Sequence, residues 1–404
     1  MKLVGRILRY VGGFLLFVLL LDVVSYVGVP VYRFAPGSSF SGDSIYNPYR
    51  DIDSSQWRKA NFHAHQRERK YESYTPDQFF AAYQQQGYDI IGLSDHCYLN
   101  YAHQERAGFI PTYEFGWGIN KAHFLMMGAS YASLRDFPFT LIPSQLQHTL
   151  RRLHSQARVV VLNHPGQLRG IDHRVYERLR GYDLLEIKPD NGAENSIPCW
   201  DRALSSGIYA NLIANDDAHT VSFRGSFFQR CFTMINTPEL DEYHILSSLK
   251  KGQSYAVRVS PELNQRPRPH EGLPTIRAIG LRENGTVHVA LSEPAREIHF
   301  VGQNGEIRSE CRDVSEASYR FTPTDTYIRV EALFDSGAEI YTNPFVRTSG
   351  IQPINVFVPD IHWPFTILLN LLWIQVVFVL CFCIAALWRL LPRNWRPDWV
   401  PVSL

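Results

Sequence analysis

Two long apolar blocks, one near each end of the chain, interrupt an otherwise mixed pattern of polar and apolar residues. The first covers about residues 10–31 and contains one charged side chain, Asp22. The second covers about residues 363–391 and has no charged side chain before Arg389. Because a helix of ~20 apolar residues crosses a hydrocarbon core, we expect an N-terminal anchor within residues 1–36 and a second membrane helix in the later block.

The flanks of these blocks predict how the chain is oriented. A cleaved signal peptide is the alternative for the first block, but it would be shorter and would end in a small-residue site that is not evident here. Basic residues lie on the chain-end side of both blocks: Lys2, Arg6, Arg9, Arg389, Arg393 and Arg396. The positive-inside rule then places both ends, including the tail 392–404, in the cytoplasm. We therefore expect residues 33–362 on the periplasmic or other outer side of a bacterial-type inner membrane.

Between the blocks, strand-like and helix-like runs alternate from about residue 54 to residue 255, within a domain that we expect over residues 37–259. The strand-like runs are 88–96, 158–164, 182–187 and 208–216, and the helix-like runs are 75–87, 143–157, 197–206 and 237–252. Such alternation is typical of βα units, which form a parallel sheet or a barrel. In the first of these helices we expect Thr75 as the N-cap, Pro76 at the first helical position and Gln78 at the capping-box position.

A different pattern follows a proline-rich linker at 260–274. Alternating strands surround Asn284-Gly285 and Asn304-Gly305, which are hairpin signals. Residues 275–348 therefore predict a small antiparallel β-sandwich. A second linker, 349–362, leads to the last apolar block.

Composition narrows the function classes. Forty basic and 39 acidic residues in 404 leave a charge of +1, which argues against a dedicated nucleic-acid binder. Six cysteines are too few for a disulfide scaffold. Four of them lie in the outer portion, where pairing is permitted but not specified by their spacing, and unpaired buried thiols are at least as expected.

Histidines and carboxylates gather where the predicted strands end. In strand geometry the HxH and DxH spacings each place two side chains on one face. Because the carboxyl ends of barrel strands converge on one mouth, these side chains should meet. They are His63 and His65, Asp95 and His96, Glu114 and His123, His164, Glu186, and Asp217 and His219.

Imidazole and carboxylate ligands together suit zinc, manganese or iron. More than four ligands indicate two or more ions, and a carboxylate such as Glu114 can bridge a pair of ions that together activate water and bind a phosphate oxygen. Any single histidine is more often an ordinary core or capping residue. Only that interpretation fits the histidines in helix-like or polar surroundings, namely His103, His148, His154, His173 and His244.

The motifs FHAH, GLSDH, Glu114 with His123, NHPG and NDDAH, in this order over 61–257, resemble those of PHP-domain (polymerase and histidinol phosphatase) metal-dependent hydrolases. Glu186, the stretch LKKGQSYAV and the phrase YTNPFV look like the CehA/McbA-type branch, which often carries a small β-domain after the barrel. The resemblance implies a distorted (β/α)7 barrel with up to three metals.

The resemblance also implies roles for individual residues. His63, His65, Glu114 and Asp217 would hold one metal, and Glu114, His123 and His164 would hold a second. His96 and His219 would serve a third site or act on the substrate, with Asp95 and Glu186 supporting the ligands. Many members carry a His or Asp about five residues after HxH, but Lys70 stands near that position here, so the third metal is in doubt. Lys70 would instead bind an anionic substrate group, or the run that contains it is a solvated loop.

These observations predict a membrane-anchored hydrolase that uses divalent Zn, Mn or Fe to cleave a phosphate ester. Its substrate would be a phosphorylated small molecule, lipid or envelope component, with no nucleic acid involved. A metal-dependent carboxylic ester or carbamate hydrolase is one alternative, because the same chemistry attacks either centre. A non-catalytic, membrane-tethered binding protein is the other.

Overall fold

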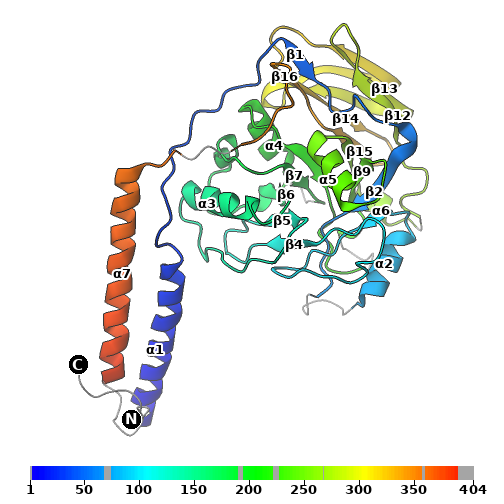
Figure 1. Cartoon of the computed structure of the whole chain (residues 1–404). Coiled ribbons are helices and arrows are strands. Elements are labelled where there is room, and N and C mark those ends of the chain that lie inside the picture. The colour runs from blue at the N-terminus through cyan, green and yellow to red at the C-terminus, as the bar shows by residue number, and fades with distance from the viewer. Residues whose placement is uncertain are drawn as a thin grey trace. The chain divides into compact units, whose positions relative to one another are not determined.

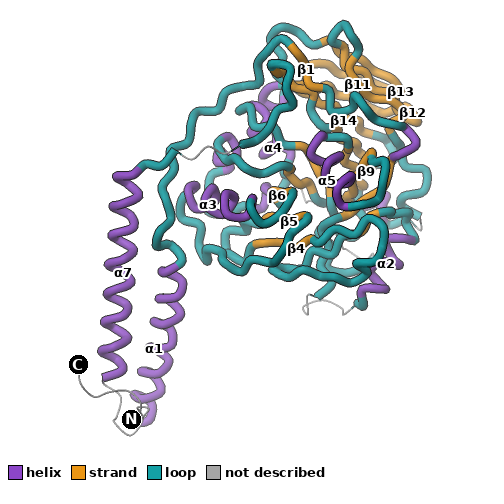
Figure 2. Tube along the Cα trace, viewed as in Figure 1, coloured by secondary structure: helices purple, strands orange, loops and turns teal. Residues whose placement is uncertain are grey.

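A computed structural model of the chain describes residues 2–67, 74–189, 194–221, 227–266, 268–356 and 360–389. It divides into two compact units (Figure 1). The helical unit comprises residues 1–33, 135–139 and 359–404, and the globular unit comprises 34–134 and 140–358. Figure 2 shows that loops make up much of the globular unit between its helices and strands.

The helical unit contains α1 (Lys2–Val24) and α7 (Trp363–Arg389). Apolar windows in both helices are long enough to cross a membrane, with mean hydropathies of 2.2 and 2.7, and only 6% of each window is buried. A core helix of a soluble protein would be mostly buried. The two helices therefore agree in length and composition with the predicted spans, while their orientation across a membrane stays a prediction.

The first helix ends earlier than its apolar block. Residues 25–28 form turns, and Gly28 has a positive φ of 85°. The chain then returns to α7: the Asn370 amide accepts a hydrogen bond from the Gly28 N–H at 2.5 Å and donates one to the Val29 carbonyl at 3.1 Å. The apolar residues after Val24 thus belong to a connection that packs on α7.

One sheet of the globular unit has five strands in the order β4-β5-β6-β7-β8. They are β4 (Thr112–Phe115), β5 (Phe124–Met127), β6 (Val159–Leu162), β7 (Leu184–Ile187) and β8 (Asn211–Ala214). The first three pair antiparallel and the last three parallel. Every residue of these strands is buried, as expected for a sheet covered on both faces.

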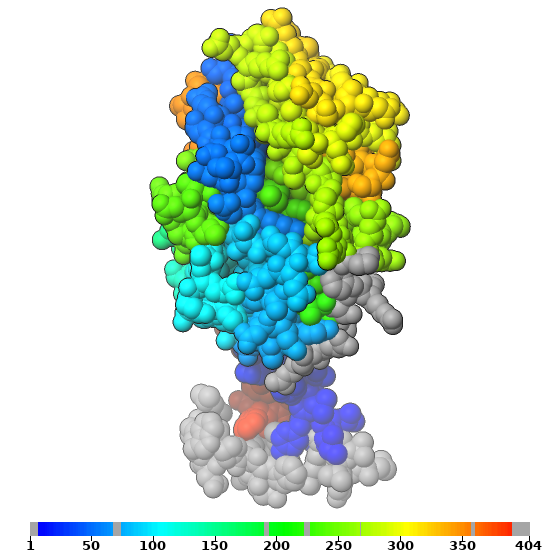
Figure 3. Space-filling model, turned by 90° about the vertical axis from the view of Figure 1, so that its right-hand side faces the viewer, coloured from blue at the N-terminus to red at the C-terminus, as the bar shows by residue number. Residues whose placement is uncertain are grey.

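The other sheet has eleven strands. Its main path is β1 (Ser44–Tyr46), β16 (Phe345–Thr348), β14 (Tyr327–Leu333), β15 (Ala338–Thr342), β10 (Ser254–Val259), β9 (Cys231–Asn236), β2 (Trp57–Asn61) and β3 (Ile90–Ile91). Branching from it are β11 (Ile276–Leu281), β12 (Thr286–Val301) and β13 (Ile307–Arg320). In Figure 3 the early residues (blue) lie directly against these later strands, in agreement with the pairing of β1 with β16.

The mixed α/β class expected from the sequence is confirmed, but the strands form more antiparallel pairs than βα units alone predict. β10 pairs with β15, so one sheet continues across the predicted boundary at residues 260–274. Single parallel bridges, Ala64 to Ala218 and His96 to Glu114, connect strand ends of the two sheets. The closed barrel and the separate sandwich stay predictions.

Helices form close to where the sequence places them. They are α2 (Pro76–Gln84), α3 (Pro143–His154), α4 (Ile197–Ser205), α5 (Glu242–Lys251) and the short α6 (Pro261–Asn264), with 3-10 turns η1 (Ser54–Gln56), η2 (Pro165–Gln167), η3 (His173–Glu177) and η4 (Gln303–Gly305). Thr75 and Gln78 form the predicted reciprocal cap of α2. The helix α6 occupies part of the predicted linker, because the Ser260 side chain caps it.

Candidate metal centre

All eight predicted metal ligands lie together at strand ends of the globular unit. His63 and His65 follow β2, His96 follows β3, Glu114 lies in β4, and His123 directly precedes β5. His164 follows β6, and Asp217 and His219 follow β8. Residues up to 156 positions apart in sequence thus share one cluster of donor atoms, as the convergence of strand ends predicts.

Four of these side chains, His63, His65, Glu114 and Asp217, bring one donor atom each within 4.8 Å of one another. The His63 and His65 Nε2 atoms are 3.1 Å apart. Each lies 3.2–3.3 Å from Glu114 Oε2 and from Asp217 Oδ1. Atoms that bind one ion tetrahedrally at about 2.0–2.1 Å lie about 3.3–3.4 Å apart, which is close to these five separations. All four residues are buried, so the donor set fits a metal ion.

Glu114 connects this set to a second one through its other oxygen. Glu114 Oε1 lies 3.1 Å from both His123 Nδ1 and His164 Nε2. The Asn163 amide donates to the same oxygen at 2.9 Å. The two carboxylate oxygens therefore face different imidazoles, as the oxygens of a bridging carboxylate would.

His96 and His219 lie on the more exposed side of the centre. His96 Nδ1 is 3.2 Å from Glu114 Oε2, and the donor atoms of His96, Glu114 and His123 group together. A further group combines His65, His96 and His219, with ring centroids 4.4–4.6 Å from His65. Both residues are partly exposed, and their position is compatible with either predicted role, a third ion or substrate contact.

Two other predicted residues form hydrogen bonds with a candidate ligand or with the backbone beside one. Glu186 Oε1 accepts a hydrogen bond from His63 Nδ1 at 2.8 Å, and the other ring nitrogen, Nε2, faces Glu114 and Asp217. Asp95 accepts the backbone N–H groups of Gln66 and Arg67 at 2.8 and 2.7 Å and so fixes the chain after His65. Lys70, the predicted anion contact, lies outside the described residues.

Sequence reasoning missed several polar neighbours of the cluster. The Lys188 ammonium lies 2.6 Å from Asp217 Oδ2. The other oxygen of this carboxylate, Oδ1, is the one that faces His63 and His65. Asn215 donates to Glu186 Oε1 at 2.9 Å, and Asn163 contacts Glu114 as described. Each of these residues lies within two positions of a predicted site residue. Asn163 belongs to the motif NHPG, Lys188 to the strand end LEIK, and Asn215 to the motif NDDAH.

The charges of the cluster favour cations. Burial alone would raise the pKa of Glu114, but the imidazoles of His63 and His123 hold it well below its usual value. Burial opposes charge on His65 as well, yet hydrogen bonds to Asp217 and Glu114 raise its pKa to about 9. The buried carboxylates thus stay ionised and attract positive charge, which divalent ions supply more strongly than protons.

The backbone is held in unusual conformations at two of the candidate ligands. His164 and Asp217 have positive φ values of 28° and 50°. A residue with a side chain adopts this region at a cost on the order of 1–3 kcal/mol, and such residues cluster at functional sites. In both, the conformation occurs just after the strand end, where the chain turns to present the side chain.

Replacing Glu186 by Gln is expected to weaken metal binding without abolishing it. The amide would keep the size of the side chain but lose the charge that orients His63, and loss of such a partner typically costs about 10–100-fold in affinity. Titration of the purified protein with a chelator of known affinity measures this change. An unchanged affinity would show that His63 needs no such support.

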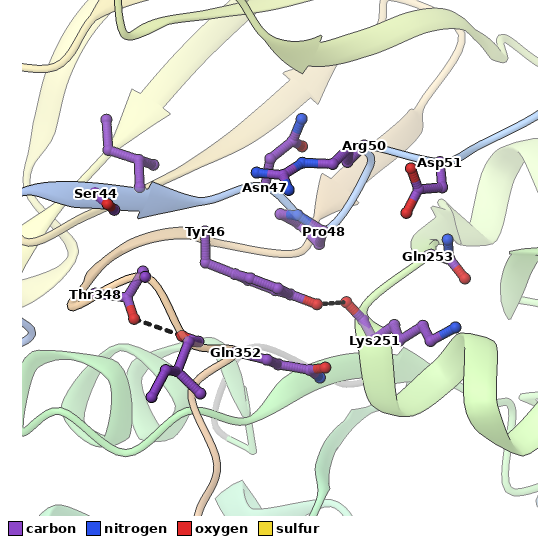
Figure 4. A pocket seen from close by; sticks show the side chains of 13 residues that line it. Ser44, Tyr46, Asn47, Pro48, Arg50, Asp51, Lys251, Gln253, Thr348 and Gln352 are labelled. Atoms are coloured by element: carbon purple, nitrogen blue, oxygen red, sulfur yellow. Dashed lines mark hydrogen bonds between the residues drawn. The ribbon is translucent and has the colours of Figure 1, made fainter.

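A further hollow of about 340 Å³ lies elsewhere in the globular unit (Figure 4). Residues of β1, of the turn after it and of the chain after β16 line it. The Tyr46 hydroxyl donates to the Lys251 carbonyl at 2.9 Å across it. No histidine is among the described residues that line it, so it is separate from the metal-ligand cluster.

Comparisons with known proteins add one distant similarity. No protein-family model and no curated protein matches the chain. The chain has a distant structural similarity to the crystal structure of a two-domain protein containing a predicted PHP-like metal-dependent phosphoesterase from Bacteroides vulgatus ATCC 8482, with 15% identity and a TM-score of 0.38. The match covers 76% of this chain and 100% of that one. The donor geometry, not this distant similarity, supports the metal centre.

Proposed function

We propose that the chain is a membrane-anchored, metal-dependent phosphoesterase of the PHP type, on the branch that resembles CehA/McbA hydrolases. The observation that carries this proposal is the buried set of His63, His65, Glu114 and Asp217, whose donor atoms fit an ion. The shared carboxylate Glu114 extends the set toward His123 and His164. Two ions are therefore proposed, and His96 and His219 are left to contact a third ion or the substrate.

The protein side chains would divide the work of hydrolysis. Divalent ions bound here supply Lewis acidity and a water of lowered pKa. His96 and His219 are the partly exposed members of the cluster, and we assign them the binding of an anionic substrate oxygen or the transfer of a proton to the leaving group. Lys188 holds Asp217 in position by its ion pair. Lys70 is proposed as a further anion contact.

The apolar helices and their flanking charges support an anchored enzyme. With both ends in the cytoplasm, the catalytic portion would face the periplasm or exterior of a bacterial-type cell. The choice of a phosphate ester rests on the resemblance of the motifs to PHP enzymes. Carboxylic esters and carbamates remain alternatives, because the same centre can attack either kind of bond.

Metal removal is expected to abolish the activity of the purified full chain. Elemental analysis should find zinc, manganese or iron, and nitrophenyl phosphate or bis-nitrophenyl phosphate should be cleaved faster than nitrophenyl acetate. Chelation should stop turnover, and adding back the metal should restore it. Faster cleavage of nitrophenyl acetate would favour the ester alternative. A metal-free protein with activity would contradict the proposal, and a metal-poor protein inactive on every substrate would favour the binding protein.

A further inference from the structure

Large apolar side chains are exposed on two neighbouring loops of the globular unit. One loop connects β4 to β5, and the other connects β5 to α3. We call their exposed side chains the apolar loop face; they are Trp117, Ile119, Tyr131, Leu134 and Leu141. Ile119 and Leu134 are 64% and 70% exposed. Clustered exposed apolar residues mark surfaces that contact a partner or a membrane, since leaving them in water is unfavourable.

Hydrogen bonds hold the two loops side by side. The Trp117 indole N–H donates to the Leu134 carbonyl at 3.1 Å. The Thr140 N–H donates to Asn120 Oδ1 at 2.6 Å. The two loops are therefore fixed to each other by hydrogen bonds, and the apolar loop face is an ordered part of the fold.

The first of these loops starts and ends at the metal-ligand cluster. Glu114 lies in β4 just before the loop, and His123 lies just after it. The Asn120 carbonyl accepts the Arg169 N–H at 2.8 Å, which joins the loop to the segment that follows His164. The apolar loop face and the candidate ligands therefore share one end of the strands β4 and β5.

The chain itself indicates what covers this face. Directly after Leu134, residues 135–139 belong to the helical unit. There the Phe137 ring lies 5.3 Å from the Tyr26 ring, and the Tyr26 hydroxyl donates to the Phe139 carbonyl at 2.8 Å. Tyr26 follows α1 by two residues and stacks on Trp373 of α7 at 4.9 Å.

This continuity constrains where the face can lie. Consecutive Cα atoms are ~3.8 Å apart, so Leu134 and Leu141 stay within a few residues of a segment packed at the end of an apolar helix. Tryptophan, tyrosine and basic residues are typical of the membrane interface. The two loops carry exposed Trp117, Lys121 and Tyr131, which are the residue types found at that interface.

We propose that the apolar loop face inserts into the headgroup region of the lipid bilayer that holds α1 and α7. This inference rests on the membrane anchoring in the proposed function and goes beyond it. It would place the end of β4 and β5, and the ligands there, at the lipid surface. A lipid bilayer is favoured over a second protein because the same loop passes directly into the segment that packs on the apolar helices.

Photo-crosslinking in liposomes tests this proposal on the full chain. Ile119 and Leu134 are replaced, one at a time, by p-benzoylphenylalanine, and so is Ile307 as the matched control. Ile307 is an exposed isoleucine, 52% accessible, on β13, which lies far from β4 and β5 in the globular unit (Figure 1). After irradiation we expect lipid adducts at positions 119 and 134 well above the background found at 307.

Other outcomes of this experiment separate the possible failures. Integration into the bilayer is checked first by resistance to alkaline extraction, and unchanged metal content and melting temperature show that each variant is folded. An integrated protein without lipid adducts at 119 and 134 would overturn the inference alone, and so would a covalent dimer formed at these positions. A protein that alkali extracts from the liposomes would overturn both the anchoring and this inference.

Discussion

Replacing Glu114 by Gln is expected to remove the bound metal and nearly all activity. Both oxygens of this carboxylate are used: Oε2 faces His63, His65 and His96, and Oε1 faces His123 and His164. An amide has the same shape but only one acceptor atom, and its NH₂ group would point at imidazole nitrogens needed as ligands. Since loss of a mere supporting partner costs about 10–100-fold, we expect kcat/KM to fall at least about a hundredfold.

Metal content and turnover of the purified Glu114→Gln variant check this expectation together. Glu239→Gln is the matched control, because Glu239 also lies in a group of carboxylates and a histidine, with Asp241 and His244, but at the exposed start of α5. The control should keep its metal and activity. A Glu114→Gln protein that retains metal and more than a tenth or so of its kcat/KM would contradict the bridging role.

Strand-end motifs allowed the candidate centre to be predicted from sequence because its residues obey simple spacing rules. His63 and His65 are two positions apart, so strand geometry puts their side chains on one face, and the same holds for Asp217 and His219. The convergence of strand ends brought the pairs together. The same rules could not find Lys188, since a lysine after a buried strand has no distinctive spacing. Its role becomes visible only through the 2.6 Å contact with Asp217.

The strand pairing was harder to predict than the strands themselves. The runs that became β9 and β10 pair antiparallel with each other, and β10 pairs onward with β15, about 80 residues later. Such long-range partners depend on side-chain packing between segments, which a period-two pattern does not specify. Likewise only Ile90 and Ile91 of the predicted strand 88–96 join a ladder. The rest of the run forms isolated backbone hydrogen bonds instead of a ladder. The Ser94 N–H donates to the carbonyl of Ala64, after β2, and the Ser94 carbonyl accepts from the Glu114 N–H in β4.

Replacing Arg329 by Ala is expected to destabilise the globular unit by about 3–5 kcal/mol. Arg329 in β14 is fully buried and donates to both oxygens of Asp201 in α4 at 2.9 and 2.8 Å. It also pairs with Glu331 and lies over the Trp200 ring, 4.9 Å from its centroid. Without the guanidinium, Asp201 keeps only the Tyr327 hydroxyl as a side-chain donor among the described contacts, so a buried negative charge would lose its counter-charge.

Thermal unfolding of the purified protein measures this loss, which should lower the melting temperature on the order of 10 °C for a unit of this size. Arg312→Ala is the control, because Arg312 is exposed and pairs with Glu310 at the surface, where an ion pair contributes about 0–1 kcal/mol. A second variant, Arg329→Met with Asp201→Leu, removes both charges. It should recover most of the stability, because replacing a whole buried pair by apolar residues is often neutral. Equal losses in the single and double variants would show that packing around Arg329, rather than its charge, holds α4 to β14.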